Sequence, residues 1–217
     1  LGNCHEDVCK WWTRQESKTH QLLLFPRDHG KSAMVAYRVA WELTKNPTLR
    51  VLYISATSNL AQKQLSFIKN IFESDIHQKY WPQHLNKDES KREKWTTSEI
   101  ALDHPDRKKE AIRDPSIFTG GLTTSLTGMH CDIAVLDDVV VFENAYTNEG
   151  RNKVKSQYSL LSSIEGSEAR EWVVGTRYHP KDLYSDLMGM EEDLYSNKDE
   201  LVGKANIYEV MERAVEA

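Results

Sequence analysis

The chain has few cysteines, no long apolar run and no excess of basic residues. Its three cysteines cannot all pair with one another, and nothing else in the 217 residues suggests a secreted disulfide scaffold, so a reducing cytoplasm is favoured. No apolar run approaches the length of a membrane span, and no signal peptide opens the sequence. The formal net charge of −5 argues against a uniformly basic coat, so any contact with nucleic acid is expected to be local.

A zinc site near the amino terminus is not supported either. Cys4, His5 and Cys9 lie close together, but their spacing matches no established zinc pattern and no second pair of ligands follows. The composition, 39% hydrophobic and 28% charged, suits one α/β domain, alone or with a small appendage. We therefore expect one ordinary globular core and no metal at these three residues.

A stretch near the amino terminus has the layout of a phosphate-binding loop. Residues 22–25 are expected to form a buried strand, Gly30-Lys31-Ser32 follows, and apolar residues then recur at helical spacing. Such a helix N-terminus offers free N–H groups to a polyphosphate, with Lys31 for the β and γ phosphates and Ser32 for Mg²⁺. The first glycine of the usual pattern is replaced by Phe25, and a surface turn capped by Ser32 is the alternative.

Later apolar segments predict a doubly wound α/β domain with a central, mainly parallel sheet flanked by helices. In such sheets, ligands bind beyond the carboxyl ends of the strands. A region between residues 74 and 114 interrupts the pattern with mixed charges, and its Arg107-Lys108-Lys109 is a candidate contact for a phosphate backbone, the alternative being a solvated face. The expected strands cover residues 50–56, 95–102, 116–121, 131–139 and 171–177, and the expected helices cover residues 59–72 and 150–164.

The apolar strand that begins at Cys131 ends in two adjacent carboxylates, Asp137 and Asp138. Alternation along a strand points them to different sides, so one can hold Mg²⁺ while the other orients the attacking water. Capping of the next segment is the alternative, but it does not explain two acids that close a buried strand after Gly-Lys-Ser. The combination predicts nucleotide hydrolysis, with Thr176 at the end of a further strand as the candidate γ-phosphate sensor.

The segment before the first strand is polar and contains two tryptophans. In P-loop ATPases this segment often lines the adenine pocket. Docking of the amino terminus onto the core is the alternative explanation for the tryptophans. The candidates for contact with the base are Trp11, Trp12, Gln15 and Gln21.

Together, these motifs resemble the ATPase domain of the large terminase subunit, the motor that packages DNA into the capsids of tailed bacteriophages. The resemblance covers most of the chain and rests on the order and spacing of the motifs, because each alone is loose. They are a degenerate Walker A motif at residues 25–32, the second strand at 53–57, residues 126–128, a Walker B motif at 134–138 and a coupling motif at 175–183.

The resemblance implies a RecA-like fold of the additional-strand class, with ATP and Mg²⁺ as cofactors. Asp138 would be the catalytic acid, with Glu143 in reserve because many family members carry Glu at the position of Asp138. Arg27 and Thr176 would assist catalysis, and residues 175–177 would couple hydrolysis to movement. Metal binding would fall to Ser32 and Asp137. The implied nucleotide-binding residues are Arg27, Asp28, His29, Gly30, Lys31, Ser32 and Ala33.

The resemblance also implies a homo-oligomeric ring in which a neighbour supplies an arginine. Arg151 is the first choice, with Arg113 and Arg177 as alternatives, and Lys153 and Lys155 would share an inter-subunit or DNA-facing role with Arg151 unless they form a solvated helix face. The implied partners are double-stranded DNA, bound without sequence preference, a portal, a small terminase subunit and the protein's own nuclease domain, at a procapsid in the host cytoplasm.

We expect an ATPase core with an amino-terminal arm over residues 1–183, and a linker or lid over residues 184–217 that contains a helix from about Asn206 and no nuclease domain. A helicase-like ATPase, a small-molecule kinase and a non-catalytic DNA-binding module are the rival functions. A helicase needs a second RecA-like domain and a Ser-Ala-Thr motif after Walker B, whereas residues 55–57 precede it. A kinase needs a substrate pocket and lid that the sequence does not reveal.

Overall fold

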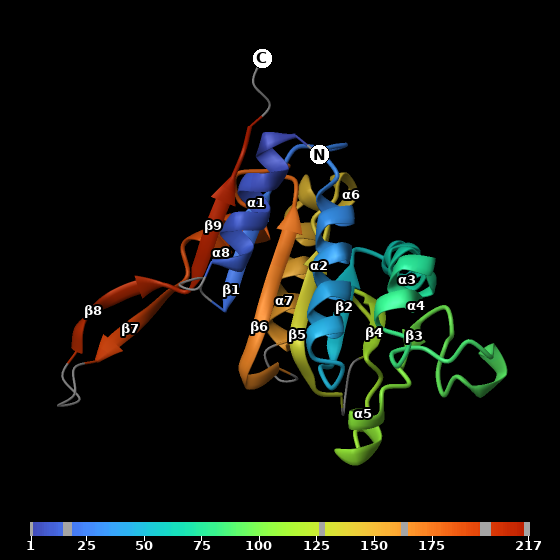
Figure 1. Ribbon diagram of the computed structural model, residues 1–217. Helices are drawn as coiled ribbons and strands as arrows, with labels where there is room; N and C mark the ends of the chain where they lie inside the picture. Colours follow the sequence, from blue (N-terminus) through green and yellow to red (C-terminus); the bar gives the residue numbers. More distant parts are fainter. Residues whose placement is uncertain (1, 15–18, 126–128, 162–164, 196–200, 215–217) are drawn as a thin grey trace.

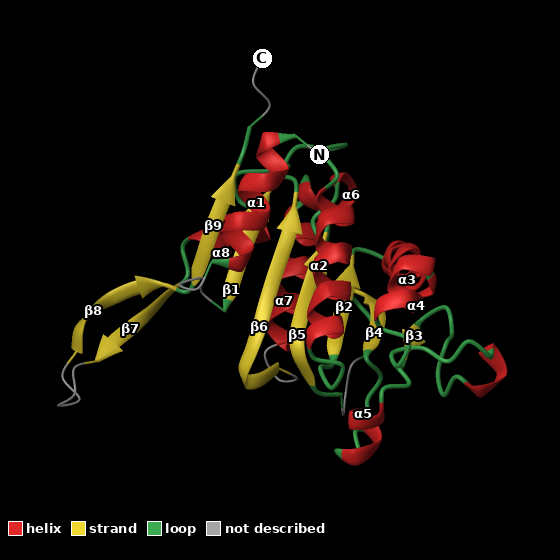
Figure 2. Cartoon of the chain, in the orientation of Figure 1, coloured by secondary structure: helices red, strands yellow, loops and turns green. Residues whose placement is uncertain are grey.

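A computed structural model describes residues 2–14, 19–125, 129–161, 165–195 and 201–214. Within these residues the core is one seven-stranded sheet in the order β3-β4-β2-β5-β6-β1-β9 (Figure 2). Every neighbouring pair is parallel except β3 with β4, which confirms the mainly parallel sheet. The strands are β1 (His20–Leu24), β2 (Val51–Ser55), β3 (Glu99–Ile100), β4 (Ile117–Gly121), β5 (Cys131–Asp137), β6 (Glu165–Gly175) and β9 (Tyr208–Glu212).

Helices cover both faces of this sheet, and Figure 1 shows α2 in front of it and α7 behind it. Side chains alternate along each strand, so that Leu23 of β1 enters the core beneath α2 and α3, while Leu22 and Leu24 enter the core beneath α7 and α8. The helices are α1 (Asn3–Thr13), α2 (Lys31–Lys45), α3 (Ser58–Glu73), α4 (Asp75–Tyr80), α5 (Pro105–Lys109), α6 (Phe142–Ala145), α7 (Asn148–Leu161) and α8 (Leu183–Met188).

The strand order carries the expected additional strand. β1, which leads into the glycine loop, and β5, which ends in the two carboxylates, are not neighbours, because β6 lies between them. The carboxyl ends of these three parallel strands meet at one edge of the sheet, where ligands of doubly wound folds bind. No helix among the described residues is long and apolar enough to cross a membrane.

The carboxyl-terminal region differs from the expectation. The helix predicted from about Asn206 is wrong: β9 begins at Tyr208 and pairs in parallel with β1. Tyr208 is buried in one core while Met211 packs against the other, an alternation that suits a strand. α8, which begins at the boundary predicted at residue 183, is also part of the core. What stands apart in Figure 1 is the hairpin of β7 (Glu191–Tyr195) and β8 (Leu201–Asn206).

The excursion after α3 is mostly irregular. β3 is only two residues long, much shorter than the strand predicted over residues 95–102. Arg107, a predicted phosphate contact, is buried: its guanidinium donates to the carbonyl oxygens of Pro47, at 3.0 Å, and Asp114, at 2.5 Å. Arg107 therefore ties α5 to the segments that precede β2 and β4. It does not face solvent, as a phosphate contact must.

Candidate nucleotide-binding site

The loop between β1 and α2 is fastened to the end of β6. Phe25, which stands where the usual loop has its first glycine, is buried and extends the strand pairing, because its N–H donates to the Gly175 carbonyl at 3.0 Å. The Thr176 hydroxyl donates to the Phe25 carbonyl, also at 3.0 Å. A residue that pairs as a strand has no need of the freedom of glycine, which accounts for the degenerate motif.

Two left-handed residues then turn the chain into α2. Asp28 has φ +63°, which Asp tolerates better than most residues, and Gly30, the N-cap of α2, has φ +68°. His5 of α1 contacts the loop from outside, with its Nε2 3.0 Å from the His29 carbonyl oxygen. The turn leaves the first N–H groups of α2 at the positive end of its helix dipole, as an anion site requires.

The two carboxylates predicted from the sequence lie against the start of α2. The Lys31 Nζ lies 3.3 Å from an oxygen of Asp138, and the Ser32 hydroxyl donates to Asp137 at 3.0 Å. The Tyr53 hydroxyl, from β2, donates to the other oxygen of Asp137 at 2.8 Å. The structure therefore brings residues 31, 32, 137 and 138 into one cluster.

Burial sets the electrostatics of this cluster. Burial and then the charge of Asp138 raise the pKa of Asp137 to about 6, against the hydrogen bonds from Tyr53 and Ser32. Burial also raises the pKa of Asp138, although the charges of Lys31 and Arg27 oppose the change. Asp138 has φ +47°, and its Oδ1 is buried without a hydrogen-bond partner among the described residues. A strained backbone and an unsatisfied carboxylate are features typical of a reacting site.

The donor set fits Mg²⁺ and a polyphosphate. Mg²⁺ prefers oxygen ligands and is usually held by one or two protein groups together with water and substrate phosphates. Ser32 and Asp137 supply such oxygens from neighbouring positions. The ammonium group of Lys31 and the N-terminus of α2 supply the positive charge that phosphates require.

Comparison with known proteins gives one consistent likeness. No family model matches the chain. Over 188 residues it is 29% identical to the terminase large subunit of Enterobacteria phage T3, an alignment that covers 85% of this chain and 30% of that protein. The chain resembles the ATPase domain of phage large terminases. The chain spans about 30% of the length of the phage T3 protein.

Solved structures of terminases and packaging motors share the fold. A mutant of the large terminase ATPase domain of Thermus phage P74-26 aligns with a TM-score of 0.54 and 13% identity, covering 99% of this chain and 81% of that one. The Phi-28 gp11 DNA packaging motor aligns with a TM-score of 0.50 and 13% identity, covering 98% and 60%. At these identities the likeness shows the fold, and it agrees with the RecA-like arrangement predicted from the sequence.

The segment that resembles the terminase coupling motif touches the loop on one side and α8 on the other. Gly175 accepts from Phe25, and any side chain at Gly175 would overlap the buried ring of Tyr184. The Tyr184 hydroxyl accepts from the N–H of Val140, just after the two carboxylates, at 3.3 Å. Neither Tyr53 nor Tyr184 was identified from the sequence, because a tyrosine within an apolar segment has the pattern of a core residue.

The three arginines proposed for a neighbouring terminase subunit differ in exposure. Arg151 is 9% exposed and donates to the carbonyl of Ala145, at 2.6 Å, and to the side chain of Asn148. This arrangement holds Arg151 inside its own subunit, at the junction of α6 and α7. Arg177 is exposed and interacts with Ser185 and Glu212, and Arg113 is exposed.

Most of the remaining candidates near the loop are exposed. Arg27, Asp28 and His29 face solvent, and Ala33 lies in the first turn of α2. Glu143, the reserve acid, is exposed in the first turn of α6.

The basic face proposed for α7 is only partly available. Lys155 forms an ion pair with Asp186 of α8 at 2.6 Å, whereas Lys153 is exposed.

The amino-terminal helix is docked on the core. The indole of Trp11 donates to Glu209 of β9 at 2.9 Å, and the guanidinium of Arg38 lies 4.9 Å from the ring centre of Trp12. Gln21 is buried and accepts from Arg38 at 2.8 Å. These contacts favour the docking explanation over an adenine contact for Trp11, Trp12 and Gln21.

Gln15 and the motif at residues 126–128 lie outside the described residues.

Proposed function

We propose that this chain is the ATP-hydrolysing motor domain of a viral large terminase, which drives double-stranded DNA into a procapsid. The observation that carries the proposal is the pairing of two residues at the start of α2 with two carboxylates at the end of β5, Lys31 with Asp138 and Ser32 with Asp137. Likeness to the terminase of phage T3 supports the choice of reaction among the many that this fold performs.

In this proposal the loop of residues 27–33, the Walker A motif, binds the phosphates of ATP through its N–H groups and Lys31. Ser32 and Asp137 hold Mg²⁺, which offsets the phosphate charge when it is bound. Asp138 accepts a proton from the attacking water, a role suited to a buried carboxylate with a raised pKa and an unsatisfied oxygen. Arg27, whose charge acts on Asp138, adds positive charge on the open side of the loop.

The ion pair between Lys31 and Asp138 keeps Asp138 a weak base until a polyphosphate binds. While Lys31 contacts Asp138, it favours the ionised carboxylate and makes it a weaker base. A polyphosphate competes for Lys31, because it carries more negative charge than one carboxylate. Once Lys31 binds the phosphates, Asp138 loses its charged partner and becomes more basic. Substrate binding thus prepares the base.

Thr176 and Gly175 provide a route by which the loop can move other elements. Thr176 holds the Phe25 carbonyl, and Gly175 lies against the ring of Tyr184 in α8. A displacement of the loop on hydrolysis therefore reaches α8 through two direct contacts. α8 contacts both β1 and β9, and the β7–β8 hairpin follows it in the chain.

The working form we propose is a ring at the procapsid in the host cytoplasm, in contact with a portal, a small terminase subunit and the nuclease domain of the full-length protein. Among the three candidates for an arginine supplied in trans, Arg113 meets the requirement of exposure best, because Arg151 is buried and Arg177 has partners within its own chain.

Phosphate release from ATP, measured over a range of protein concentrations with and without double-stranded DNA, tests the proposal. A motor that needs a neighbour should show activity per molecule that rises with concentration and is stimulated by duplex DNA. Stimulation by single-stranded DNA together with strand separation would favour a helicase. Transfer of phosphate to a small acceptor in place of water would favour a kinase.

A further inference from the structure

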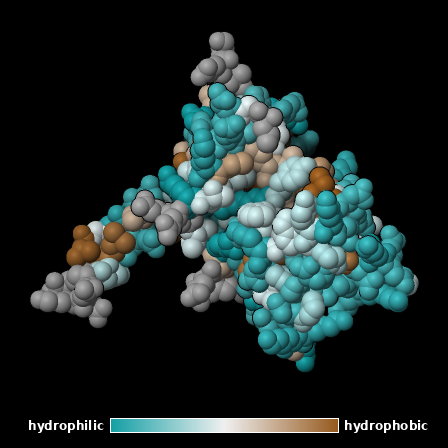
Figure 3. Space-filling view, in the orientation of Figure 1, coloured by the Kyte–Doolittle hydropathy of each residue, from teal (hydrophilic) through white to brown (hydrophobic). Residues whose placement is uncertain are grey.

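The β7–β8 hairpin exposes apolar side chains that nothing in the described chain covers. Leu194, Tyr195, Leu201 and Val202, on either side of residues 196–200, are between 41% and 63% exposed. Figure 3 shows a hydrophobic cluster on this hairpin, well away from the body of the domain. A two-stranded ribbon is at best marginally stable alone, and an apolar cluster on it marks a contact surface.

A second apolar surface lies over α2, α3 and α4. It is a groove of about 490 Å³, and its exposed side chains include Tyr37 at 57%, Trp41 at 50% and Ile76 at 71%. Phe67, Ile71 and Trp81 complete its apolar wall. This surface is called the α2–α4 groove below.

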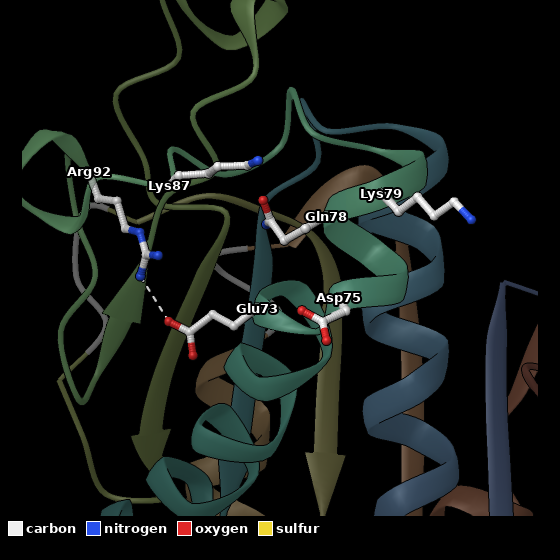
Figure 4. A pocket seen from close by; sticks show the side chains of 6 residues that line it. All are labelled: Glu73, Asp75, Gln78, Lys79, Lys87 and Arg92. Atoms are coloured by element: carbon white, nitrogen blue, oxygen red, sulfur yellow. Dashed lines mark hydrogen bonds and ion pairs between the residues drawn. The ribbon is translucent and has the colours of Figure 1, made fainter.

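The hollow on the other side of α4 has a different character. Figure 4 shows that it is lined by charged and amide side chains, among which Arg92 pairs with Glu73 at 2.8 Å. Because its charges are of both signs and partly paired, this hollow indicates no ligand chemistry. Of these two hollows beside α4, the α2–α4 groove is the apolar one.

We propose that the β7–β8 hairpin of one copy of the chain docks in the α2–α4 groove of the next copy. The hairpin emerges between α8 and β9, beside the β9 edge of the sheet, whereas α3 packs on β2 and β4 near the opposite edge. The two surfaces thus lie on opposite flanks of the domain, as Figure 1 also shows. Head-to-tail association covers both of them in a single step.

Charge supports the same partner. The described part of the hairpin carries three carboxylates, Glu191, Glu192 and Asp193, against the single Lys204, which lies 4.0 Å from two of them. Both cations that lie over exposed rings of α2 and α4 are lysines: Lys45 lies over Trp41, and Lys79, which also lines the hollow on the other side of α4, lies over Tyr80. Lys45 also forms an ion pair with Glu42, but no carboxylate of the described chain pairs with Lys79.

The geometry of this contact has a consequence for assembly. A head-to-tail contact uses two different patches, so each added copy leaves one hairpin and one groove available for the next. Such a contact builds a ring when the rotation between copies closes. It needs no nucleotide, and it places α8, which precedes the hairpin, next to the neighbouring subunit.

Complementation between two variants tests the proposal. The hairpin variant carries Leu201→Thr and Val202→Thr, which remove apolar surface and keep strand-forming residues. The groove variant carries Trp41→Gln and Ile76→Gln, both at exposed helical positions. Each variant alone should associate at least about tenfold more weakly than the parent chain in sedimentation. An equal mixture should form a one-to-one dimer that does not grow, because only one intact hairpin and one intact groove remain.

The control variant, Leu160→Ser, removes an exposed leucine from α7, on the opposite face of the sheet, and should associate like the parent. Circular dichroism and thermal unfolding establish that each variant is folded. If the groove variant is not folded, Lys79→Glu, at an exposed position, replaces it and should also weaken association. Three results overturn the proposal: a parent chain that stays monomeric up to its solubility limit, variants that associate like the parent, or a mixture that does not dimerise.

Discussion

Replacing Asp137 by Asn should stabilise the nucleotide-free chain at neutral pH while it impairs the site. Asp137 is 3% exposed, and burial together with the charge of Asp138 raises its pKa from 3.8 to about 6. An acid with a raised pKa binds its proton more tightly in the folded state than in the unfolded state. Its contribution to stability is therefore full below pH 3.8 and is lost as the pH rises through about 6.

The magnitude follows from the shift. A difference of about two pKa units corresponds to about 3 kcal/mol of unfolding free energy, lost once the pH is well above 6. Asparagine avoids this cost, but one of its two polar atoms is a donor, so either Ser32 or Tyr53 must reverse its hydrogen bond, at a cost of about 1 kcal/mol. The expected net gain at about pH 8 is roughly 2 kcal/mol.

Urea unfolding of both proteins, at several pH values between about 4 and 8, measures this gain. Asp137→Asn should be slightly less stable than the parent near pH 4, by at most about 1 kcal/mol, and should be more stable by about 2 kcal/mol at pH 8. Asp132→Asn on the same strand is the matched control with the opposite sign. Burial acts to raise the pKa of Asp132, but the hydrogen bonds and charge of Arg50 outweigh it, so this pKa is lowered. Removing the charge of Asp132 should therefore destabilise the chain, and the loss should shrink as the pH falls through the lowered pKa.

A constant difference between the parent and Asp137→Asn across this pH range would refute the reasoning, because it would mean that Asp137 titrates alike in the folded and unfolded states. Magnesium provides a second check. With ATP and Mg²⁺ present, the parent should gain stability by binding, and Asp137→Asn, which lacks the carboxylate for the metal, should gain less.

Three further substitutions have distinct expected outcomes. Asp138→Asn should still bind ATP with Mg²⁺ in a fluorescence titration but release phosphate at least ~10²-fold more slowly. Glu143→Gln should release phosphate at about the rate of the parent. Gly175→Ala should lower the unfolding free energy by about 1–3 kcal/mol in urea, because the added methyl group displaces Tyr184. Arg151→Ala should lower it by a similar amount, because the Ala145 carbonyl loses its buried donor, while phosphate release per folded molecule stays near that of the parent.

Each of these outcomes can fail in a specific way. Slow hydrolysis in Glu143→Gln with normal hydrolysis in Asp138→Asn would transfer the role of catalytic acid to Glu143. Normal stability of Gly175→Ala would mean that Tyr184 can move aside without loss. A stable Arg151→Ala whose hydrolysis fails only at high protein concentration would assign Arg151 to a neighbouring active site, as the sequence first suggested.

Local patterns predicted most of the sheet and its helices. The strands at β1, β2, β4 and β5 and the helices α2, α3 and α7 follow from apolar periodicity and from glycine, proline and capping residues within a few positions. β9 was predicted as a helix because its strand conformation depends on pairing with β1, more than 180 residues earlier in the chain. Short segments of this kind take their structure from the partner strand more than from their own sequence.

The candidate site was accessible from the sequence for a different reason. Motif order alone places Lys31 and Ser32 opposite Asp137 and Asp138, although the hydrogen bond from Ser32 to Asp137 joins residues 105 positions apart. Tyr53 had no such signal, because only the folded sheet turns its hydroxyl toward Asp137. The burial of Arg151 was also hidden, since a basic residue in a polar helix has the pattern of a solvated face.

The proposed ATPase is tested most directly by steady-state phosphate release from ATP with Mg²⁺, compared among the parent chain, Lys31→Ala and Lys10→Ala. Lys31 is buried at the start of α2 against Asp138, whereas Lys10 is exposed in α1, outside both the site and the α2–α4 groove. The account predicts that Lys31→Ala loses both nucleotide binding and hydrolysis while Lys10→Ala keeps them. Hydrolysis by Lys31→Ala at the rate of the parent would contradict it.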